Sequence, residues 1–387
     1  MKRIFVFLIA ASVFLSLCGC GLYEKEYVSV KDYEPSDTSQ SSAGEMAVVA
    51  NYSGLKRTLL ALVRAGTEKD RIVFEDSYPG DVSEDLSSAC WEIRTQNALC
   101  AYCVENISYD TSYLVTHYEA DISVTYAPGF DVSSVITSSY ITGVSRYILE
   151  SYNGNRPRTV LLISNGSYSA DEISELCLST YRDNPLSCIS KPQIEVNLFS
   201  GSGHEKLYEI NMNYQLQPEE ILAGKEKLES FDYSAIGIPE DSSDEYTAFY
   251  VLKYLHDTVE FVQDPGHSSA FSALIEKKAD SEGLAMAYVA LCKNFGIECE
   301  AVEGQKNWDD HFWNIVGIEG ENFHVDVSAS YESDDLSKYF LANDSNLWGS
   351  YRWDTSSYPS CSVSVSFDIP EETPPPEETV PTEETEG

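Results

Sequence analysis

The sequence KADSEGLAMAYVALCKNFGIECEAVEG, residues 278–304, determines the fold of the C-terminal part of this chain. It predicts a polar helix start, an apolar helix and a strand, and the strands that follow each carry a polar group. Ser281 stands at the helix start, His311 opens HFWNIV, and Asp326 lies in FHVDV. A hydroxyl, an imidazole and a carboxylate in this order predict a nucleophile, a base and an orienting group.

Further segments in the same order resemble the core of the transglutaminase-like (papain-like thiol enzyme) superfamily over about residues 243–341, a quarter of the chain. They are YLHDTV (254–259), AFSALIE (270–276), ADSEGLA (279–285), FGIEC (295–299), HFWN (311–314), HVDV (324–327) and KYFL (338–341). The resemblance implies an α+β fold with a transglutaminase-like domain at residues 231–367. It also implies that Trp313 and Asn314 pack around and position His311, and that the site needs neither a metal nor another cofactor.

The chain departs from the family at the nucleophile, because Ser281 stands where the family has cysteine. A thiol with a pKa near 8.5 can give its proton to histidine and rest as an ion pair. A hydroxyl is too weak an acid, so it must lose its proton during attack. Cys292 cannot replace it, because eleven residues along a helix is about 16 Å. Cys299 is predicted to be a core residue.

Two hypotheses for the function follow. In the first, the domain is catalytically silent and binds a peptide, a glycan or a surface protein; Ser281 is then only a helix cap, and His311–Asp326 a retained structural hydrogen bond. In the second, the protein is a peptidase or acyl-transfer enzyme that uses Ser281 as nucleophile, His311 as base and Asp326 as orienting group. The missing thiol favours the first hypothesis.

The N-terminus predicts an exported lipoprotein. Lys2 and Arg3 precede an apolar run that is short for a membrane span, and Leu17-Cys18-Gly19-Cys20 follows it. This pattern resembles the bacterial lipoprotein signal, which implies a signal peptide at residues 1–19 and a lipid on Cys20. The expected location is the extracytoplasmic face of a bacterial cell membrane, with the lipid as the only anchor. An ordinary secretory signal is the alternative.

Charge and cysteine content limit the possible partners and sites. The net charge of −38 argues against nucleic acid, whose phosphates require a basic surface. Of ten cysteines, eight remain without Cys18 and Cys20, an even number that permits disulfides in an exported protein. Cys100 and Cys103 lie in an apolar periodic stretch without a nearby histidine. They are therefore predicted to be core residues or a structural bridge rather than a metal or redox pair.

The rest of the chain divides by composition into segments with different expected structures. Residues 20–45 predict a flexible tether, and residues 368–387, rich in Glu, Pro and Thr, a disordered tail. Residues 46–230 alternate between helical and strand patterns and predict an α/β-type domain of unknown role. Within it, we expect helices at 82–107 and 132–151 and a hairpin at 194–214.

Overall fold

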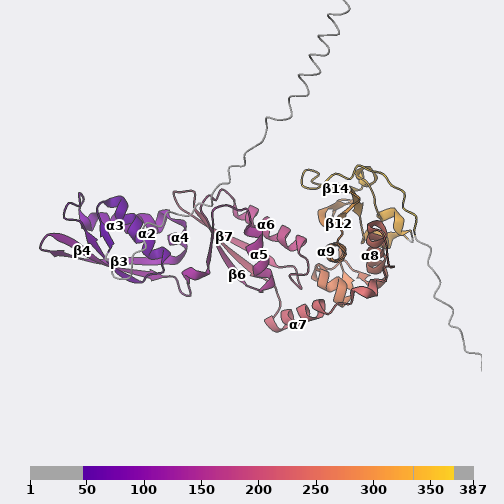
Figure 1. Ribbon diagram of the computed structural model, residues 1–387, viewed down its shortest axis with the longest axis horizontal. Coiled ribbons are helices and arrows are strands. Elements are labelled where there is room, and N and C mark those ends of the chain that lie inside the picture. Colours follow the sequence, from indigo (N-terminus) through magenta and orange to yellow (C-terminus); the bar gives the residue numbers. More distant parts are fainter. Residues whose placement is uncertain (1–46, 334, 370–387) are drawn as a thin grey trace, which may run out of the picture. The chain divides into compact units, whose positions relative to one another are not determined.

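The computed structural model describes residues 47–333 and 335–369 (Figure 1). The predicted signal peptide, Cys20 and the tether lie outside the described residues, as does the predicted tail from residue 370 onward. Within the described ranges, no helix combines the length and the apolar character needed to cross a membrane.

The first sheet contains four strands in the order β1-β2-β4-β3. Its strands are β1 (Ala47–Val49), β2 (Lys69–Phe74), β3 (Val104–Leu114) and β4 (His117–Tyr126). Helices α2 (Tyr52–Arg64), α3 (Val82–Gln96) and α4 (Ala98–Cys103) accompany it. Their apolar side chains form one core with the sheet, in which Leu55, Leu86 and Ile72 are fully buried.

The second sheet also has four strands, in the order β5-β6-β8-β7. These are β5 (Val135–Ser138), β6 (Arg158–Ile163), β7 (Gln193–Ser200) and β8 (Lys206–Asn213). Helices α5 (Val144–Asn153), α6 (Ala170–Asp183) and α7 (Pro218–Glu229) accompany this sheet. The expected hairpin at 194–214 is formed by β7 and β8, which pair antiparallel.

Two of the expected helices were wrong in extent. The predicted helix 82–107 is two helices and the start of strand β3, because Asn97 ends α3 with an extended backbone and its side chain caps α4. The predicted helix 132–151 is an α-helix only from Val144, and residues 132–134 form a short 3₁₀ helix. Residues 135–138 form β5, and Gly143, with a left-handed φ of 85°, precedes α5.

The C-terminal sheet has the order β13-β12-β11-β14, with antiparallel pairing throughout. Its strands are β11 (Cys299–Lys306), β12 (Asp309–Ile318), β13 (Glu321–Val325) and β14 (Tyr351–Trp353). The helices are α8 (Asp244–Thr258), α9 (Ser281–Asn294) and α10 (Asp344–Leu347), and two short strands pair as β9 (Glu260–Phe261) and β10 (Lys278–Ala279). The short 3₁₀ helices of the described residues are η1 (Val132–Ser134), η2 (Tyr233–Ile236), η3 (Pro265–His267), η5 (Ala329–Glu332) and η6 (Leu336–Tyr339), and η4 (Ser272–Glu276) is a short π-helix.

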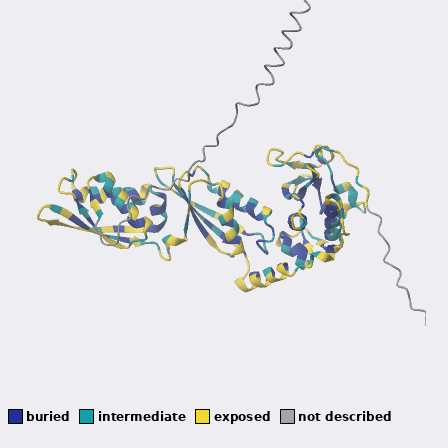
Figure 2. Cartoon of the chain, in the orientation of Figure 1, coloured by how far each residue is buried: buried dark blue, intermediate teal, exposed yellow. Residues whose placement is uncertain are grey.

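Helix α9 lies in the core, and its residues from 282 to 292 are all buried (Figure 2). The same hydrophobic core continues through side chains of α5, α6 and β8, among them Ile148, Tyr181 and Tyr208. The second sheet and the C-terminal domain therefore share one core. The observed helices and sheets confirm the predicted α+β class.

The eight cysteines of the described residues are all buried free thiols. Burial raises the pKa of Cys100 and of Cys103 to about 12. Both therefore remain protonated at neutral pH and pack as small apolar side chains, which agrees with a core role for this pair.

Candidate functional site

The start of α9 carries Ser281, and it is capped by the preceding residue. The Asp280 carboxylate accepts a hydrogen bond from the Gly283 N–H at 2.8 Å. Ser281 is thus the first helical residue, and the reading of Ser281 as the cap was wrong. Gly283 allows a close approach here, because a Cβ would lie 2.3 Å from the His267 carbonyl oxygen.

The Ser281 hydroxyl has one hydrogen-bond partner among the described residues. Its Oγ accepts from the Phe312 backbone N–H at 3.4 Å, across from β12. Ser281 and His311 line the same cleft, which has a volume of about 500 Å³. No hydrogen bond joins the two side chains, although both lie within the described part of the chain.

His311 and Asp326 form a tight pair behind the cleft. His311 Nε2 lies 2.7 Å from Asp326 Oδ2, which also accepts from the Tyr351 hydroxyl at 2.7 Å. The other oxygen, Oδ1, accepts from the Ser328 hydroxyl and the Ala329 N–H, each at 2.8 Å. Burial would raise the pKa of Asp326, but the hydrogen bonds, that of His311 foremost, lower it overall. Asp326 is therefore an ionised carboxylate, and it accepts a hydrogen bond from the N–H at His311 Nε2.

This arrangement leaves His311 Nδ1 available. It makes no hydrogen bond with a described residue, and the His311 side chain is 13% exposed. A neutral imidazole with its proton on Nε2 presents a lone pair at Nδ1, which is the form that a general base requires.

The two predicted supporting residues act at different places. Trp313 packs its ring almost parallel to His311, with centroids 6.2 Å apart. Asn314 instead lies on the other face of β12, where its Nδ2 donates to the Ala285 carbonyl of α9 at 3.0 Å. Trp313 thus positions His311 directly, whereas Asn314 fixes the helix that carries Ser281.

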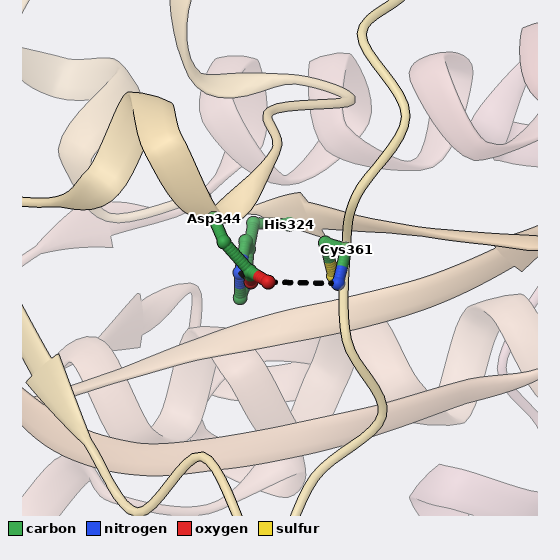
Figure 3. A group of neighbouring side chains, drawn as sticks. All are labelled: His324, Asp344 and Cys361. Carbon is green, nitrogen blue, oxygen red and sulfur yellow. Dashed lines mark hydrogen bonds and ion pairs between the residues drawn. The ribbon is translucent and has the colours of Figure 1, made fainter.

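A second histidine–aspartate pair lies on the far side of Trp313. His324 Nε2 is 2.9 Å from Asp344 Oδ1, and Asp344 Oδ2 accepts from the Cys361 N–H at 3.2 Å (Figure 3). The possible ligand atoms of these three residues all lie within 4.8 Å of one another, close enough to consider a metal ion.

The hydrogen bonding of His324 does not suit a metal. The Trp313 indole Nε1–H can only donate, and it points to His324 Nδ1 at 3.0 Å. Nδ1 therefore carries no proton, and in the neutral ring Nε2 carries it and donates to Asp344. A metal on Nε2 would require an imidazolate. Burial, partly opposed by Asp344, lowers the pKa of His324, which also favours the neutral ring.

The cleft has a negative lining. Its acidic residues are Asp264, Asp280, Asp309, Asp310 and Glu332. Glu332 pairs with Lys306 at 2.7 Å, and the other four make no ion pair with a described residue. This excess of negative charge disfavours anionic ligands.

Several residues around the site were absent from the sequence prediction. Tyr351, Ser328 and Asp344 belong to no motif, and the first of them reaches Asp326 only because β14 pairs with β11. His324 was visible in the quoted HVDV segment, two residues before Asp326. The hydrogen bond from Trp313 to His324 was not predictable, because no local sequence pattern links these two residues.

Comparison with known proteins supports the same family. Residues 235–327 match the family model described as the transglutaminase-like superfamily. This part of the chain is a transglutaminase-like domain. No curated protein shows a significant match to the sequence.

Solved structures with local likeness include a TGase, at 12% identity over 52% of this chain and 60% of that chain, with a TM-score of 0.26. A candidate cysteine protease from Cytophaga hutchinsonii matches at 17% identity over 35% of this chain and 62% of that one, with a TM-score of 0.23. A candidate protease from Parabacteroides distasonis matches at 5% identity over 70% and 41%, with a TM-score of 0.22. This chain spans less than two thirds of each.

Proposed function

We propose that this protein is a lipid-anchored, extracytoplasmic binding protein of a bacterial cell surface, whose transglutaminase-like domain is catalytically silent. Its cleft holds a peptide, a glycan or a surface protein. The observation that carries the proposal is the missing hydrogen bond between Ser281 and His311, since among the described residues the Ser281 hydroxyl is bonded only to the Phe312 N–H.

That observation matters because of the nucleophile. A thiolate can form without a short contact to the base, since a thiol ionises near neutral pH. A hydroxyl must be hydrogen-bonded to its base at about 2.6–3.2 Å when it attacks. Ser281 stands at the position that suits a thiolate. With serine there, no negatively charged sulfur lies at the positive N-terminal end of α9. The start of α9 is therefore better suited to bind a ligand than to attack one.

A second candidate function is an acyl-transfer or peptidase activity through Ser281, His311 and Asp326. The specific observation in its favour is the 2.7 Å contact between His311 and Asp326, with His311 Nδ1 left free. Catalytic hydrogen bonds also shorten when substrate binds.

One experiment separates the two functions. We expect a serine-directed fluorophosphonate to leave Ser281 of the wild-type protein unlabelled. We expect Ser281→Cys to be alkylated by iodoacetamide at pH 6 about 100-fold faster than an ordinary thiol, because His311 can take its proton. The buried native thiols remain slow; burial raises the pKa of Cys361, for example, to about 12.

The matched control is the double variant Ser281→Cys, His311→Ala, in which the fast alkylation at pH 6 should disappear. Labelling of wild-type Ser281 by the fluorophosphonate, together with peptide hydrolysis lost in Ser281→Ala, would establish the enzyme instead.

The anchor is tested separately. We expect a radioactive fatty acid to be incorporated into the wild-type protein in bacteria and not into Cys20→Ser, and the variant to leave the membrane fraction. Incorporation that persists in Cys20→Ser would contradict lipid attachment at this residue.

A further inference from the structure

The turn between β11 and β12 carries a tryptophan in an unfavourable backbone conformation. Lys306 pairs with Asp309, so that Asn307 and Trp308 alone form the turn. Their φ values are 53° and 79°, both in the left-handed region. Glycine is the residue that fits the second position of such a turn, and a bulky aromatic residue is an outlier there. Such strain is often retained where a residue has a function.

The Trp308 side chain stacks on an arginine and is nevertheless exposed. The Arg352 guanidinium carbon lies 3.4 Å from the centroid of its ring, a close cation–π stack from β14. Trp308 nevertheless remains 70% exposed. One face of the indole is thus held by Arg352, and much of the ring is left to solvent.

A second exposed tryptophan lies on the neighbouring turn. Trp348 is 72% exposed and is followed by Gly349, whose φ is 101°. The Asn307 N–H donates to the Ser350 carbonyl at 2.7 Å, which ties this turn to that of Trp308. Two of the three exposed tryptophans of the described residues therefore stand on adjacent, connected turns.

The turn of Trp308 borders the cleft, and the turn of Trp348 borders a second cavity beside it. Asn307 lines the cleft that contains Ser281 and His311, and it also lines a second cavity of about 500 Å³ together with Ser350. A ligand in the cleft can therefore extend over the turns without leaving the surface of the domain.

We propose that Trp308 and Trp348 form a platform for a neutral oligosaccharide that extends from the cleft. A pyranose ring stacks its C–H face on a flat indole, and its hydroxyls donate to nearby carboxylates such as those of Asp309 and Asp310. An apolar peptide side chain would instead favour an enclosed pocket, whereas Trp308 is 70% exposed and Trp348 is 72% exposed. This inference rests on the proposed binding function and names its ligand class.

The charge of the chain restricts the oligosaccharide. The four unpaired carboxylates of the cleft and the net charge of −38 repel a polyanion. The platform therefore favours uncharged sugars such as β-linked glucose or N-acetylglucosamine over uronic acids.

The test uses the full chain purified in detergent, with chitohexaose and cellohexaose as neutral probes and a galacturonate hexamer as the anionic probe. We expect at least one neutral hexaose to bind by calorimetry and to protect tryptophan fluorescence from acrylamide quenching. The galacturonate hexamer should not bind. Trp308→Ala and Trp348→Ala should each weaken the binding about tenfold.

Trp91→Ala is the matched control. Trp91 is also an exposed tryptophan, at 58%, but it lies on α3 beside the first sheet and does not line the cleft. It should bind as the wild type does. Trp308→Gly is a second variant, since glycine fits a φ of 79°; it should unfold at no lower urea concentration than the wild type and still lose binding.

The platform is refuted if neither neutral hexaose binds at millimolar concentration, or if Trp91→Ala weakens binding as much as the platform variants do. It is equally refuted if only a peptide protects these tryptophans. The binding test can fail independently of the proposed function. Reaction of wild-type Ser281 with fluorophosphonate would contradict the silent-domain proposal. A tenfold loss of hexaose binding in Trp308→Ala and in Trp348→Ala would still support the platform.

Discussion

Two histidine–aspartate pairs lie on either side of Trp313, and they differ in what the second ring nitrogen does. In His311–Asp326, Nε2 faces the carboxylate and Nδ1 has no described partner. In His324–Asp344, Nε2 also faces the carboxylate, but Nδ1 accepts from Trp313. The first imidazole can still take up a proton from a ligand or nucleophile, and the second cannot without losing a hydrogen bond. A histidine–aspartate pair alone therefore does not define a catalytic base.

The carboxylates differ as well. Asp326 is buried and receives four hydrogen bonds, whereas the Asp344 side chain is 28% exposed. The carboxylate of the pair that resembles catalytic machinery is thus the more buried of the two and the more extensively hydrogen-bonded. Retention of His311–Asp326 in a silent domain consequently needs no reaction to explain it.

The largest expected effect comes from removing the better-held carboxylate. Asp326→Ala leaves His311 and three other donors without their acceptor in a buried site, and it should lower the free energy of unfolding by about 3–5 kcal/mol. Asp344→Ala should cost less, about 1–2 kcal/mol, because the Asp344 side chain is 28% exposed and water can enter the space that it leaves. Urea unfolding followed by circular dichroism measures both. Equal losses in the two variants would show that the pairs are equivalent.

The sequence allowed the prediction of those parts of the site that rest on local patterns. The apolar run after Ser281 predicts α9, and the quoted HFWN and HVDV segments place His311 in one strand and Asp326 at the end of the next. The structure places their side chains 2.7 Å apart. A histidine–carboxylate pair at this place follows from the strand order that the family resemblance implies.

The remainder depends on contacts between distant segments. Tyr351 reaches Asp326 because β14 adds to the sheet beside β11, after a connection of short turns whose path has no periodic signature. Asn97 is a comparable case within the first sheet domain. Its side chain caps α4, yet the apolar spacing continues through Cys103 and predicts one uninterrupted helix.

The smallest expected effect, and the one that isolates His324, is on the pH dependence of stability. Burial lowers the pKa of His324, so the unfolded chain takes up a proton near pH 6.5 before the folded chain does. Stability contributed by the neutral ring is therefore complete above about pH 6.5 and is lost as the pH falls from there toward the folded-state pKa.

Asp326 affects stability at lower pH. Because its pKa is lowered in the folded chain, its contribution to stability is complete above about pH 4 and is lost as the pH falls through the folded-state pKa.

His324→Gln separates the two windows, because glutamine retains a donor and an acceptor but does not titrate. Between pH 7.5 and 5, the midpoint of urea unfolding should fall less steeply for His324→Gln than for the wild type, while the other five histidines contribute alike to both. Below pH 4 the two curves should run parallel, since Asp326 is common to both proteins. Parallel curves between pH 7.5 and 5 would mean that His324 takes up its proton equally in the folded and unfolded chains. The Trp313 hydrogen bond would then not hold the ring neutral, and the distinction between the two pairs would rest on the geometry of Asp326 alone.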